Sequence, residues 1–540
     1  MHKIVRPARV AALAFIVLCG SAVAENAVTT DEATEEALEF GRRIYEEGIL
    51  SSGESLTAVV SGDVEITGEF VVCGECHRKS GLGASEGEFI APPVVGSLLY
   101  IPLQLPVSRP PEPPVQRPAY DYDSLSVSIR DGISSTGEEF SMLMPRYPLS
   151  DEDMGYLIAY LESLTIEPDP GVTETDIHFA TIITDDVVPE ARKALLDVFD
   201  TFIEQKNTET RYETKRATSG PWHKDWVFKP YRKWVVHAWD LTGPPSSWPD
   251  QLEALYAEQP VFAVINGVTN GSWQPVHEFC ENAQLPCLFP TTNLPVVDRE
   301  DFYNVYLSRG ITMEAQAVAS NLVNAEIALD SITQVYKAGD EQSETAAAAL
   351  TGLLGESIRT VTLDEFSSAP ADSAVIVTWL GSDAVNELSS AFGDAERLYL
   401  SGSLLDGNEA SLDATLKPIA WLVYSTEHPD KTARLLARST GWFRVKRIYA
   451  PEYEDIQGNA YFTLKMTGGG LNAIRIFFNR DYFIESLEHM IDNATYTSVY
   501  PRMSLAPEQR FASKGSTIAR FDEENPGKLV TVQDWLIPAF

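Results

Sequence analysis

The feature that most constrains the fold is an alternation of two patterns through the larger part of the chain. Short apolar runs rich in β-branched residues, such as IHFATII (177–183), alternate with amphipathic helical segments, such as VPEARKALLDVFDTFIEQ (188–205). Strands joined by helices run parallel and are covered on both faces. We therefore expect residues 177–540 to form two α/β lobes, to which the chain returns through helices near 456–492.

Small polar residues follow several of these strands, where open α/β sheets bind ligands. The segment INGVTNGSWQPVHEFCENAQ (265–284) predicts a strand, a turn and a helix whose first N–H groups can hold a carboxylate. For any single residue here, a plain role in a short turn is the alternative. The candidate ligand-binding residues are Thr184, Asp185, Asn266, Gly267, Thr269, Asn270, Gly271, Ser272, Thr291, Thr292 and Asn293.

A different chemistry is encoded in residues 36–165. The letters CGECH (73–77) form C-x-x-C-H, the spacing for covalent attachment of a c-type haem. Cys73 and Cys76 would bond the haem, and His77 would be an axial iron ligand. A redox dithiol or half of a zinc site is the alternative for a bare C-x-x-C. The adjacent histidine and the lack of a second C-x-x-C favour one covalently attached haem c.

A second axial ligand is expected downstream of this motif. Met144 precedes Pro145, and a helix with Ser150 as its N-cap follows. Met142 is a rival ligand, whereas Met154 lies inside the closing helix, where a methionine usually fills a core. We expect Met144 to be the ligand.

The order of these segments resembles a class I c-type cytochrome. An opening helix (37–49), C-x-x-C-H, Pro-Pro, Met-Pro and a closing helix follow one another in that order. The resemblance implies a small all-α domain in which the carbonyl of Pro92 or Pro93 accepts a hydrogen bond from His77 Nδ1. It also implies His/Met ligation by Met144, which is suited to electron transfer.

A Pro-rich stretch at 102–118 makes the loop of this first domain unusually long. Seven prolines in that stretch exclude a helix or a central strand, so we expect an extended surface loop.

The strand and helix order of 177–540 resembles the type I periplasmic binding protein fold, as in branched-chain amino-acid receptors of ABC importers. The segment YPRMSLAPEQRFASKG (500–515) is similar to the C-terminal part of these proteins. The resemblance implies a two-lobed α/β domain that binds a small solute between its lobes.

Two further cysteines, Cys280 and Cys287, lie in this second domain. Cys73 and Cys76 are assigned to haem, so a bond between Cys280 and Cys287 would leave no thiol free in an oxidising compartment. We therefore expect a Cys280–Cys287 disulfide. Two buried reduced cysteines are the alternative.

The N-terminus and the charge indicate the compartment. Residues 1–24 are typical of a signal peptide, with a basic start, an apolar run at 10–18 and small residues before a cleavage site after Ala24. An uncleaved anchor is the alternative. Residues 25–35 form an acidic leader, and residues 166–176 form a Pro-containing linker.

A formal net charge of −37 argues against nucleic-acid binding, and no later segment is apolar enough to span a membrane.

These features predict a periplasmic monohaem cytochrome that exchanges electrons with a periplasmic redox partner. Its second domain would bind a small organic solute or dock that partner, for which a quinone-cofactor dehydrogenase is one candidate. The alternative is a solute-binding receptor of an ABC importer or sensor with an accessory haem. G-x-S-x-G, H-E-x-x-H and P-loop motifs are missing from the sequence, so we do not expect an enzyme. A peroxidase-like enzyme is the third and weakest interpretation.

Overall fold

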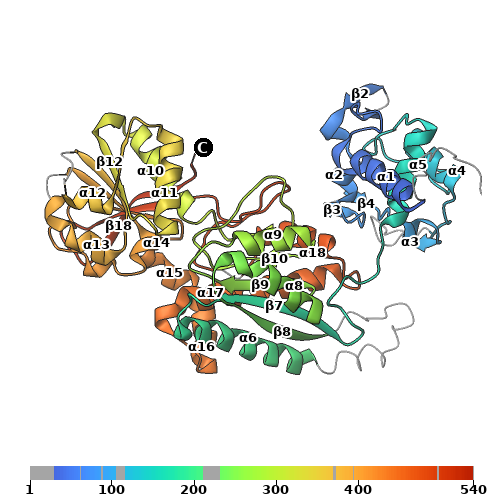
Figure 1. Cartoon of the computed structure of the whole chain (residues 1–540). Helices are drawn as coiled ribbons and strands as arrows, with labels where there is room; N and C mark the ends of the chain where they lie inside the picture. Colours follow the sequence, from blue (N-terminus) through green and yellow to red (C-terminus); the bar gives the residue numbers. More distant parts are fainter. Residues whose placement is uncertain are drawn as a thin grey trace, which may run out of the picture. The chain divides into compact units, whose positions relative to one another are not determined.

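The computed structural model divides into two compact units (Figure 1). The first comprises residues up to His77 and Gly83–Thr165, and the second comprises Arg78–Leu82 and Ile166–Phe540. The structure describes residues 30–60, 63–86, 89–104, 116–210, 232–368, 373–392, 395–495 and 498–538. The signal peptide 1–24, residues 25–29 of the leader 25–35 and residues 105–115 of the Pro-rich loop 102–118 lie outside the described residues.

The first unit is built mainly from helices. They are α1 (Thr30–Arg42), a π-helical turn η1 (Arg43–Glu47), a 3-10 turn η2 (Gly68–Val71), α2 (Cys73–His77), α3 (Gly96–Leu99), α4 (Tyr122–Asp131) and α5 (Asp151–Ser163). The predicted helix at 37–49 thus begins earlier, and its last turn is π-helical until Gly48 ends it with a left-handed φ of 65°.

The expectation of an all-α first domain is wrong in one respect. Among the described residues, six short strands form three antiparallel pairs. The pairs are β1 (Thr57–Val60) with β2 (Val64–Thr67), β3 (Ala84–Glu86) with β4 (Phe89–Ala91), and β5 (Leu103–Gln104) with β6 (Gln116–Arg117). Strands of two to four residues lie within the loops between helices, and runs this short have too little periodicity to be recognised in a sequence.

The first and last helices of this unit pack closely against each other. A Cβ atom at Gly41 of α1 would lie 2.2 Å from the carbonyl oxygen of Tyr156 in α5, so only glycine fits this crossing. The Phe40 and Tyr156 rings, with centroids 5.2 Å apart, flank the contact. Met154 of α5 is fully buried in the adjoining core.

The second unit contains two α/β lobes, as the sequence predicts. The first lobe has a parallel sheet in the order β11-β10-β9-β7-β8. Its strands are β7 (Asp176–Thr184), β8 (Lys233–Leu241), β9 (Ala263–Val268), β10 (Cys287–Leu288) and β11 (Asn304–Val305), and its helices include α6 (Pro189–Thr210), α8 (Trp248–Glu258) and α9 (Gln274–Asn282).

The central strand β7 explains why this sheet is covered on both faces. Ile177, Phe179 and Ile183 point into the core formed with α6. Ala180 and Ile182 point the other way, into the core formed with α8 and α9. A strand buried on both sides reads as a nearly continuous apolar run. Figure 1 shows α6 and α8 on opposite faces of the sheet.

The second lobe has a larger, mixed sheet in the order β13-β12-β14-β15-β16-β17-β18. Its strands are β12 (Ile332–Tyr336), β13 (Arg359–Thr362), β14 (Val375–Trp379), β15 (Arg397–Ser401), β16 (Ala420–Tyr424), β17 (Ser516–Phe521) and β18 (Leu529–Leu536). Its helices are α10 (Ile311–Asn324), α11 (Glu341–Leu354), α12 (Leu363–Ser368), α13 (Ser382–Glu387) and α14 (Gly402–Leu405). The antiparallel pair β17–β18 closes one edge of this sheet and was not predicted.

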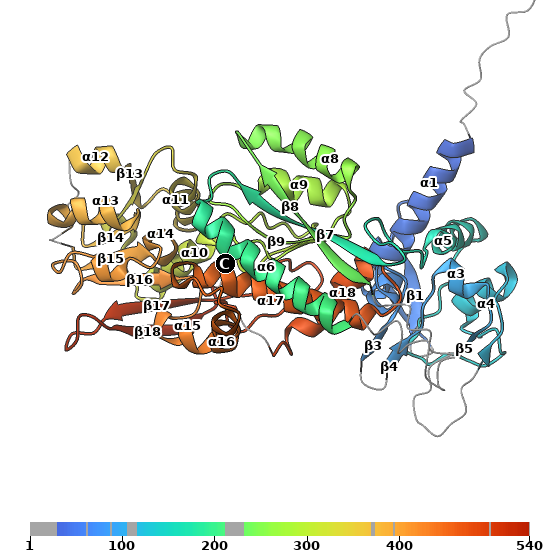
Figure 2. The same cartoon turned by 90° about the horizontal axis from the view of Figure 1, so that it is seen from below.

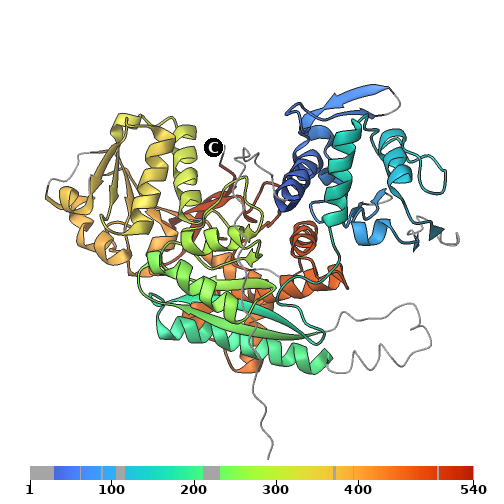
Figure 3. The ribbon, with the colours of Figure 1, turned by 45° about the vertical axis from the view of Figure 1, so that its right-hand side comes forward.

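Between β16 and β17 the chain returns to the first lobe. The returning helices are α15 (Pro429–Leu435), α16 (Ala437–Lys446), α17 (Glu454–Ile474) and α18 (Arg480–Ile491). Residues of α16, α17 and α18 share one core with β7 and α6, and Figures 2 and 3 show these orange and red helices beside the green elements. The predicted return near 456–492 is therefore found.

Short 3-10 turns complete the connections of the second unit. They are η3 (Pro245–Ser247), η4 (Leu329–Ser331), η5 (Ser389–Ala391), η6 (Glu409–Ser411) and η7 (Pro451–Tyr453).

Two local features of the second unit concern predicted residues. Cys280 of α9 and Cys287 of β10 are joined by a disulfide. Part of the expected linker 166–176 packs on the second unit, where the N–H of Asp169 donates to the carbonyl of Phe478 over 2.9 Å. In addition, a Cβ at Gly171 would lie 2.1 Å from the Phe262 nitrogen.

Candidate functional site

The first unit contains an open cavity at the C-x-x-C-H motif. Cys76 and His77 of α2 lie in its wall, together with Met144 from the segment before α5. Most of the remaining wall is apolar and comes from the β4–α3 region, α4 and α5: Ile90, Val94, Leu99, Leu125, Ile129 and Leu161. The wall of the cavity therefore contains a histidine nitrogen and a methionine sulfur that could bind iron, and most of the remaining wall is apolar.

His77 is held in a defined orientation. Its side chain is 7% exposed, and its Nδ1 lies 2.8 Å from the carbonyl oxygen of Pro92. A carbonyl can only accept, so Nδ1 carries the proton and Nε2 is the nitrogen that can bind a metal. Pro93 lines the cavity but does not accept this bond. Burial lowers the pKa of His77, which favours the neutral, metal-binding form.

Cys73 and Cys76 of the motif are not joined by a disulfide. Burial raises the pKa of the Cys73 thiol to about 12, so that thiol stays protonated. Tyr147, which donates from its hydroxyl to the carbonyl of Val71 over 2.9 Å, packs in the same core as Cys73.

The three candidate methionines have different positions. Met144 is partly buried in the cavity wall, whereas Met142 is 68% exposed and is not part of the wall. Met154 is fully buried in the core behind α5. Of the three, Met144 shares the cavity with His77.

These residues fit the group that the motif implies. A c-type haem requires two thiols, an imidazole nitrogen fixed through its other nitrogen, and apolar surroundings for the macrocycle. The cavity at Cys76, His77 and Met144 supplies these features, with Cys73 in the core directly beside it.

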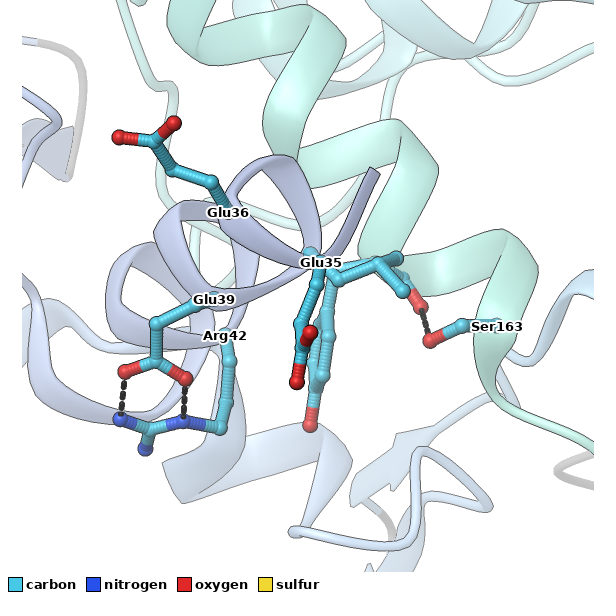
Figure 4. A pocket seen from close by; sticks show the side chains of 7 residues that line it. Glu35, Glu36, Glu39, Arg42 and Ser163 are labelled. Atoms are coloured by element: carbon cyan, nitrogen blue, oxygen red, sulfur yellow. Dashed lines mark hydrogen bonds and ion pairs between the residues drawn. The ribbon is translucent and has the colours of Figure 1, made fainter. Parts of the chain in front are cut away.

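A second depression in the first unit lies between α1 and α5 (Figure 4). Glu39 accepts two hydrogen bonds from the guanidinium of Arg42, at 2.6 and 2.8 Å, and Ser163 donates to the carbonyl of Tyr160. The cation of this depression, Arg42, is therefore paired with a carboxylate of its own helix.

The second unit has a cleft of about 660 Å³ between its lobes. Its wall combines loops after β9 and β10 of the first lobe, the start of α10, the loops after β15 and β16, and the start of α17. A volume of this size is typical of a site for a small organic molecule.

The predicted ligand-binding residues divide into two groups. Thr269, Asn270, Thr291, Thr292 and Asn293 line the cleft, as the positions after parallel strands predict. The others lie outside its lining. Thr184 donates to Asp186, Asp185 accepts from the N–H of Gly243, Asn266 donates to the carbonyl of Phe289, and Ser272 donates through its N–H to Glu341 of the second lobe. Gly267 lies in β9, and Gly271 lies in the β9–α9 connection.

The N–H groups just before α9, where the sequence predicts a site for a ligand carboxylate, already have acceptors within the chain. The N–H of Asn270 donates to Asp186 over 3.2 Å, and the N–H of Ser272 donates to Glu341 over 3.0 Å. The N–H of Gly271 donates to the hydroxyl of Thr269. The chain's own acceptors already use these donors, and both carboxylates come from segments that the local sequence does not reveal.

A buried carboxylate of the second lobe also lines the cleft, and sequence reasoning missed it. Glu314, in the first turn of α10, is 0% exposed. It accepts from the hydroxyl of Ser401, from the N–H and hydroxyl of Ser403 (3.1 and 2.7 Å), and from the N–H of Ser425 (3.4 Å). Burial raises its pKa to about 7, although these hydrogen bonds act in the opposite direction.

A further cluster of possible metal ligands has a structural role. His277, Glu281 and Asp301 place one ligand atom each within 4.8 Å of one another. However, Glu281 already accepts from the N–H groups of Phe302, Tyr303 and Asn304 and from the amide of Asn304. Its carboxylate therefore fixes the loop before β11.

Comparisons with known proteins concern mainly the fold. No protein-family model and no curated protein matches this sequence. Similar solved structures include a possible leucine/isoleucine/valine-binding protein from Rhodopirellula baltica SH 1, with 12% identity, a TM-score of 0.49, and coverage of 67% of this chain and 97% of that chain. A leucine-binding protein from Thermotoga maritima has 10% identity, a TM-score of 0.46, and coverage of 67% and 99%.

A solute-binding protein from R. palustris in complex with benzoate is also similar, with 14% identity, a TM-score of 0.45, and coverage of 68% and 97%. The sheet orders and the returning helices of this chain define the fold of its second unit. That unit has a two-lobed α/β fold, with a parallel sheet in the first lobe and a mixed sheet in the second. Among the described residues, no helix has the length and apolarity that crossing a bilayer requires.

The raised pKa of Glu314 predicts a pH dependence of stability. The pKa of Glu314 in the folded state, about 7, exceeds its ordinary value of 4.5. The stabilisation of the fold by the protonated carboxyl is therefore complete below about pH 4.5 and is lost as the pH rises through about 7. From pH 4.5 to 8, we expect the unfolding free energy of the wild type, relative to Glu314→Gln, to fall by up to about 3 kcal/mol.

Urea unfolding followed by tryptophan fluorescence measures this difference, because all 10 tryptophans lie after Thr165 and report on the second unit. A difference in unfolding free energy that is the same at every pH reflects the hydrogen bonds that Glu314→Gln loses. A difference that does not change with pH would contradict the raised pKa.

Proposed function

We propose that the first unit is a monohaem c-type cytochrome that transfers electrons in the periplasm. The observation that carries this proposal is the cavity wall formed by Cys76, His77 and Met144, with Nδ1 of His77 fixed on the carbonyl of Pro92. Bound haem would supply one-electron transfer to or from a periplasmic redox partner.

Each residue has a distinct role in this proposal. Cys73 and Cys76 would hold the haem covalently, and His77 Nε2 and Met144 would be the two axial ligands. The hydrogen bond to Pro92 keeps the His77 ring oriented and its Nε2 basic. The apolar residues of α4 and α5 limit the access of water, which affects the redox potential.

The attachment predicts a measurable cofactor content. Full-length protein that is expressed with a c-type maturation system should contain one haem per chain, which acid–acetone does not extract. Cys73→Ala/Cys76→Ala should lose the covalent haem because both thioether positions are gone. The matched control Cys280→Ala/Cys287→Ala should keep it. Haem that extracts into the solvent, or two haems per chain, would refute the proposal.

The sixth ligand can be assigned with two single variants. The oxidised wild-type protein should have a weak near-infrared band from sulfur-to-iron charge transfer. Met144→Ala should abolish this band and lower the redox potential, because thioether ligation favours the reduced iron. Met142→Ala, at the exposed rival position, should leave both unchanged. The opposite pattern would assign Met142.

We further propose that the second unit binds a small solute in the interlobe cleft. This proposal rests on the lobed architecture and on the cleft of about 660 Å³ lined by both lobes. It favours solute binding over docking of a redox partner at this site, because a partner protein needs a broad surface, whereas a cleft encloses a small molecule. The chain would then be an exported solute-binding protein that carries a haem.

Solute binding is tested with a panel of amino acids, organic acids, amines and sugars. At about 100 times its dissociation constant, a bound solute should add about 2.7 kcal/mol to the stability of the second unit. Asn270→Trp, which places an indole ring at an exposed position of the cleft wall, should remove this gain. Asn324→Trp, at an exposed position outside the cleft lining, is the control. A panel without any stabilising member would refute this role.

A further inference from the structure

The lining of the interlobe cleft has a strong bias of charge. Seven of its residues are Asp or Glu, and none of the described lining residues is Lys, Arg or His. Within the described parts of the chain, Glu427 is the one member with an ion pair, to Lys431 at 3.5 Å. Carboxylates that surround a cleft without cationic partners create a negative potential inside it.

Local structure explains only some of these carboxylates. Glu454 and Asp455 lie in the first turn of α17, where the helix dipole favours negative charge. Glu409 accepts from the hydroxyl of Tyr424 over 3.0 Å. Glu314, Asp406 and Glu452 remain. Glu314 is fully buried with neutral donors alone, Asp406 forms the left-handed end of α14, and Glu452 is exposed.

A second observation is independent of charge. Asn459 of α17 lines the same cleft and is 1% exposed. Its Nδ2 donates to the hydroxyl of Thr291 over 3.3 Å, but its Oδ1 has no hydrogen-bond partner within the described chain. A buried acceptor without a donor is costly, so a ligand that brings an N–H group to this wall would gain affinity.

The aromatic residues of the wall suggest which kind of cation fits. Tyr424, Tyr453 and Tyr500 line the cleft beside apolar side chains such as Val187 and Leu436. Ring faces attract organic cations, and apolar side chains bind a carbon skeleton. A bare metal ion would instead require a shell of six to eight oxygen ligands around one point.

The backbone donors that the sequence predicts for an anion have acceptors within the chain. The N–H groups of Asn270 and Ser272, which a ligand carboxylate would need, already donate to Asp186 and Glu341. An anion in the cleft would therefore meet seven carboxylates without the help of these two N–H groups.

We propose that the interlobe cleft binds an organic amine in its ammonium form. The ammonium group would lie among the carboxylates that include Glu314 and Asp406, with an N–H directed to Asn459 Oδ1. This inference rests on the proposed solute-binding function of the second unit and specifies its ligand class.

Three four-carbon probes that differ in charge test the ligand class on the full-length protein. Titration calorimetry compares butane-1,4-diamine, butane-1,4-diol and succinate, and calcium chloride serves as a fourth probe. We expect the diamine to bind and its affinity to fall with added salt, because the attraction is electrostatic. The diol, succinate and calcium should bind far more weakly.

Two double variants with equal changes of charge locate the binding. Asp406→Asn/Glu452→Gln removes two exposed carboxylates of the cleft, and asparagine tolerates the left-handed backbone at position 406. Asp330→Asn/Glu356→Gln removes two exposed carboxylates outside the cleft lining. The cleft variant should bind the diamine about tenfold more weakly, and the control should match the wild type.

Equal loss in both variants would overturn the inference, because the attraction would then come from the overall charge. Diol or succinate binding as tightly as the diamine, with a loss in the cleft variant, would refute the amine class and keep solute binding. Calcium binding without diamine binding would also refute it. If the diamine does not bind, the amine class is refuted. The solute panel separately tests whether the second unit is a solute receptor.

Discussion

The buried guanidinium of Arg480 holds the first lobe together. Arg480 is 6% exposed, and it donates to the carbonyls of Pro170, Val261 and Phe262 and to the hydroxyl of Tyr256. A buried cation is tolerated when its donors are all satisfied, and here they bind segments that are far apart in the sequence. Because Arg480 lies on the returning helix α18, the first lobe is incomplete until the chain has passed through the second lobe and come back. The crossings between the lobes, and the cleft that they border, follow from this topology.

Contacts across the mouth of the cleft connect the two lobes directly. Glu341 and Gln342, at the start of α11 in the second lobe, bind the N–H of Ser272 and the carbonyl of Asn270 in the first. The amide of Asn293 donates to Gln342 over 3.0 Å. These few hydrogen bonds are polar and peripheral, so they can break and form again as the lobes move. Of the N–H groups that the sequence predicted for a ligand, the one of Ser272 therefore serves the contact between the lobes.

Periodicity made the central parallel strand predictable, because β7 is a buried run with few polar residues and its predicted range, 177–183, differs from the observed one by one residue at each end. The C-x-x-C-H motif likewise located one wall of the first cavity. What the sequence could not reveal depends on segments that meet only in the folded chain. Glu314 is bound in the cleft wall by Ser401, Ser403 and Ser425, which come from separate segments, and the choice of Pro92 over Pro93 as the acceptor for His77 depends on the folded backbone. The pair β17–β18 was missed because its strands follow a long irregular segment.

Selectivity in the cleft must come from its buried groups and not from the net charge of −37. At physiological ionic strength, screening acts over about 8 Å, so exposed carboxylates outside the cleft attract every cation weakly and alike. A buried carboxylate such as Glu314 is screened far less, and the uncompensated oxygen of Asn459 accepts a hydrogen bond in one direction only. Charge distinguishes cations from anions, whereas the position of these two groups relative to the tyrosine rings distinguishes one amine from another. The exposed acidic surface can therefore raise the local concentration of cations, while the deep wall of the cleft decides which of them stays bound.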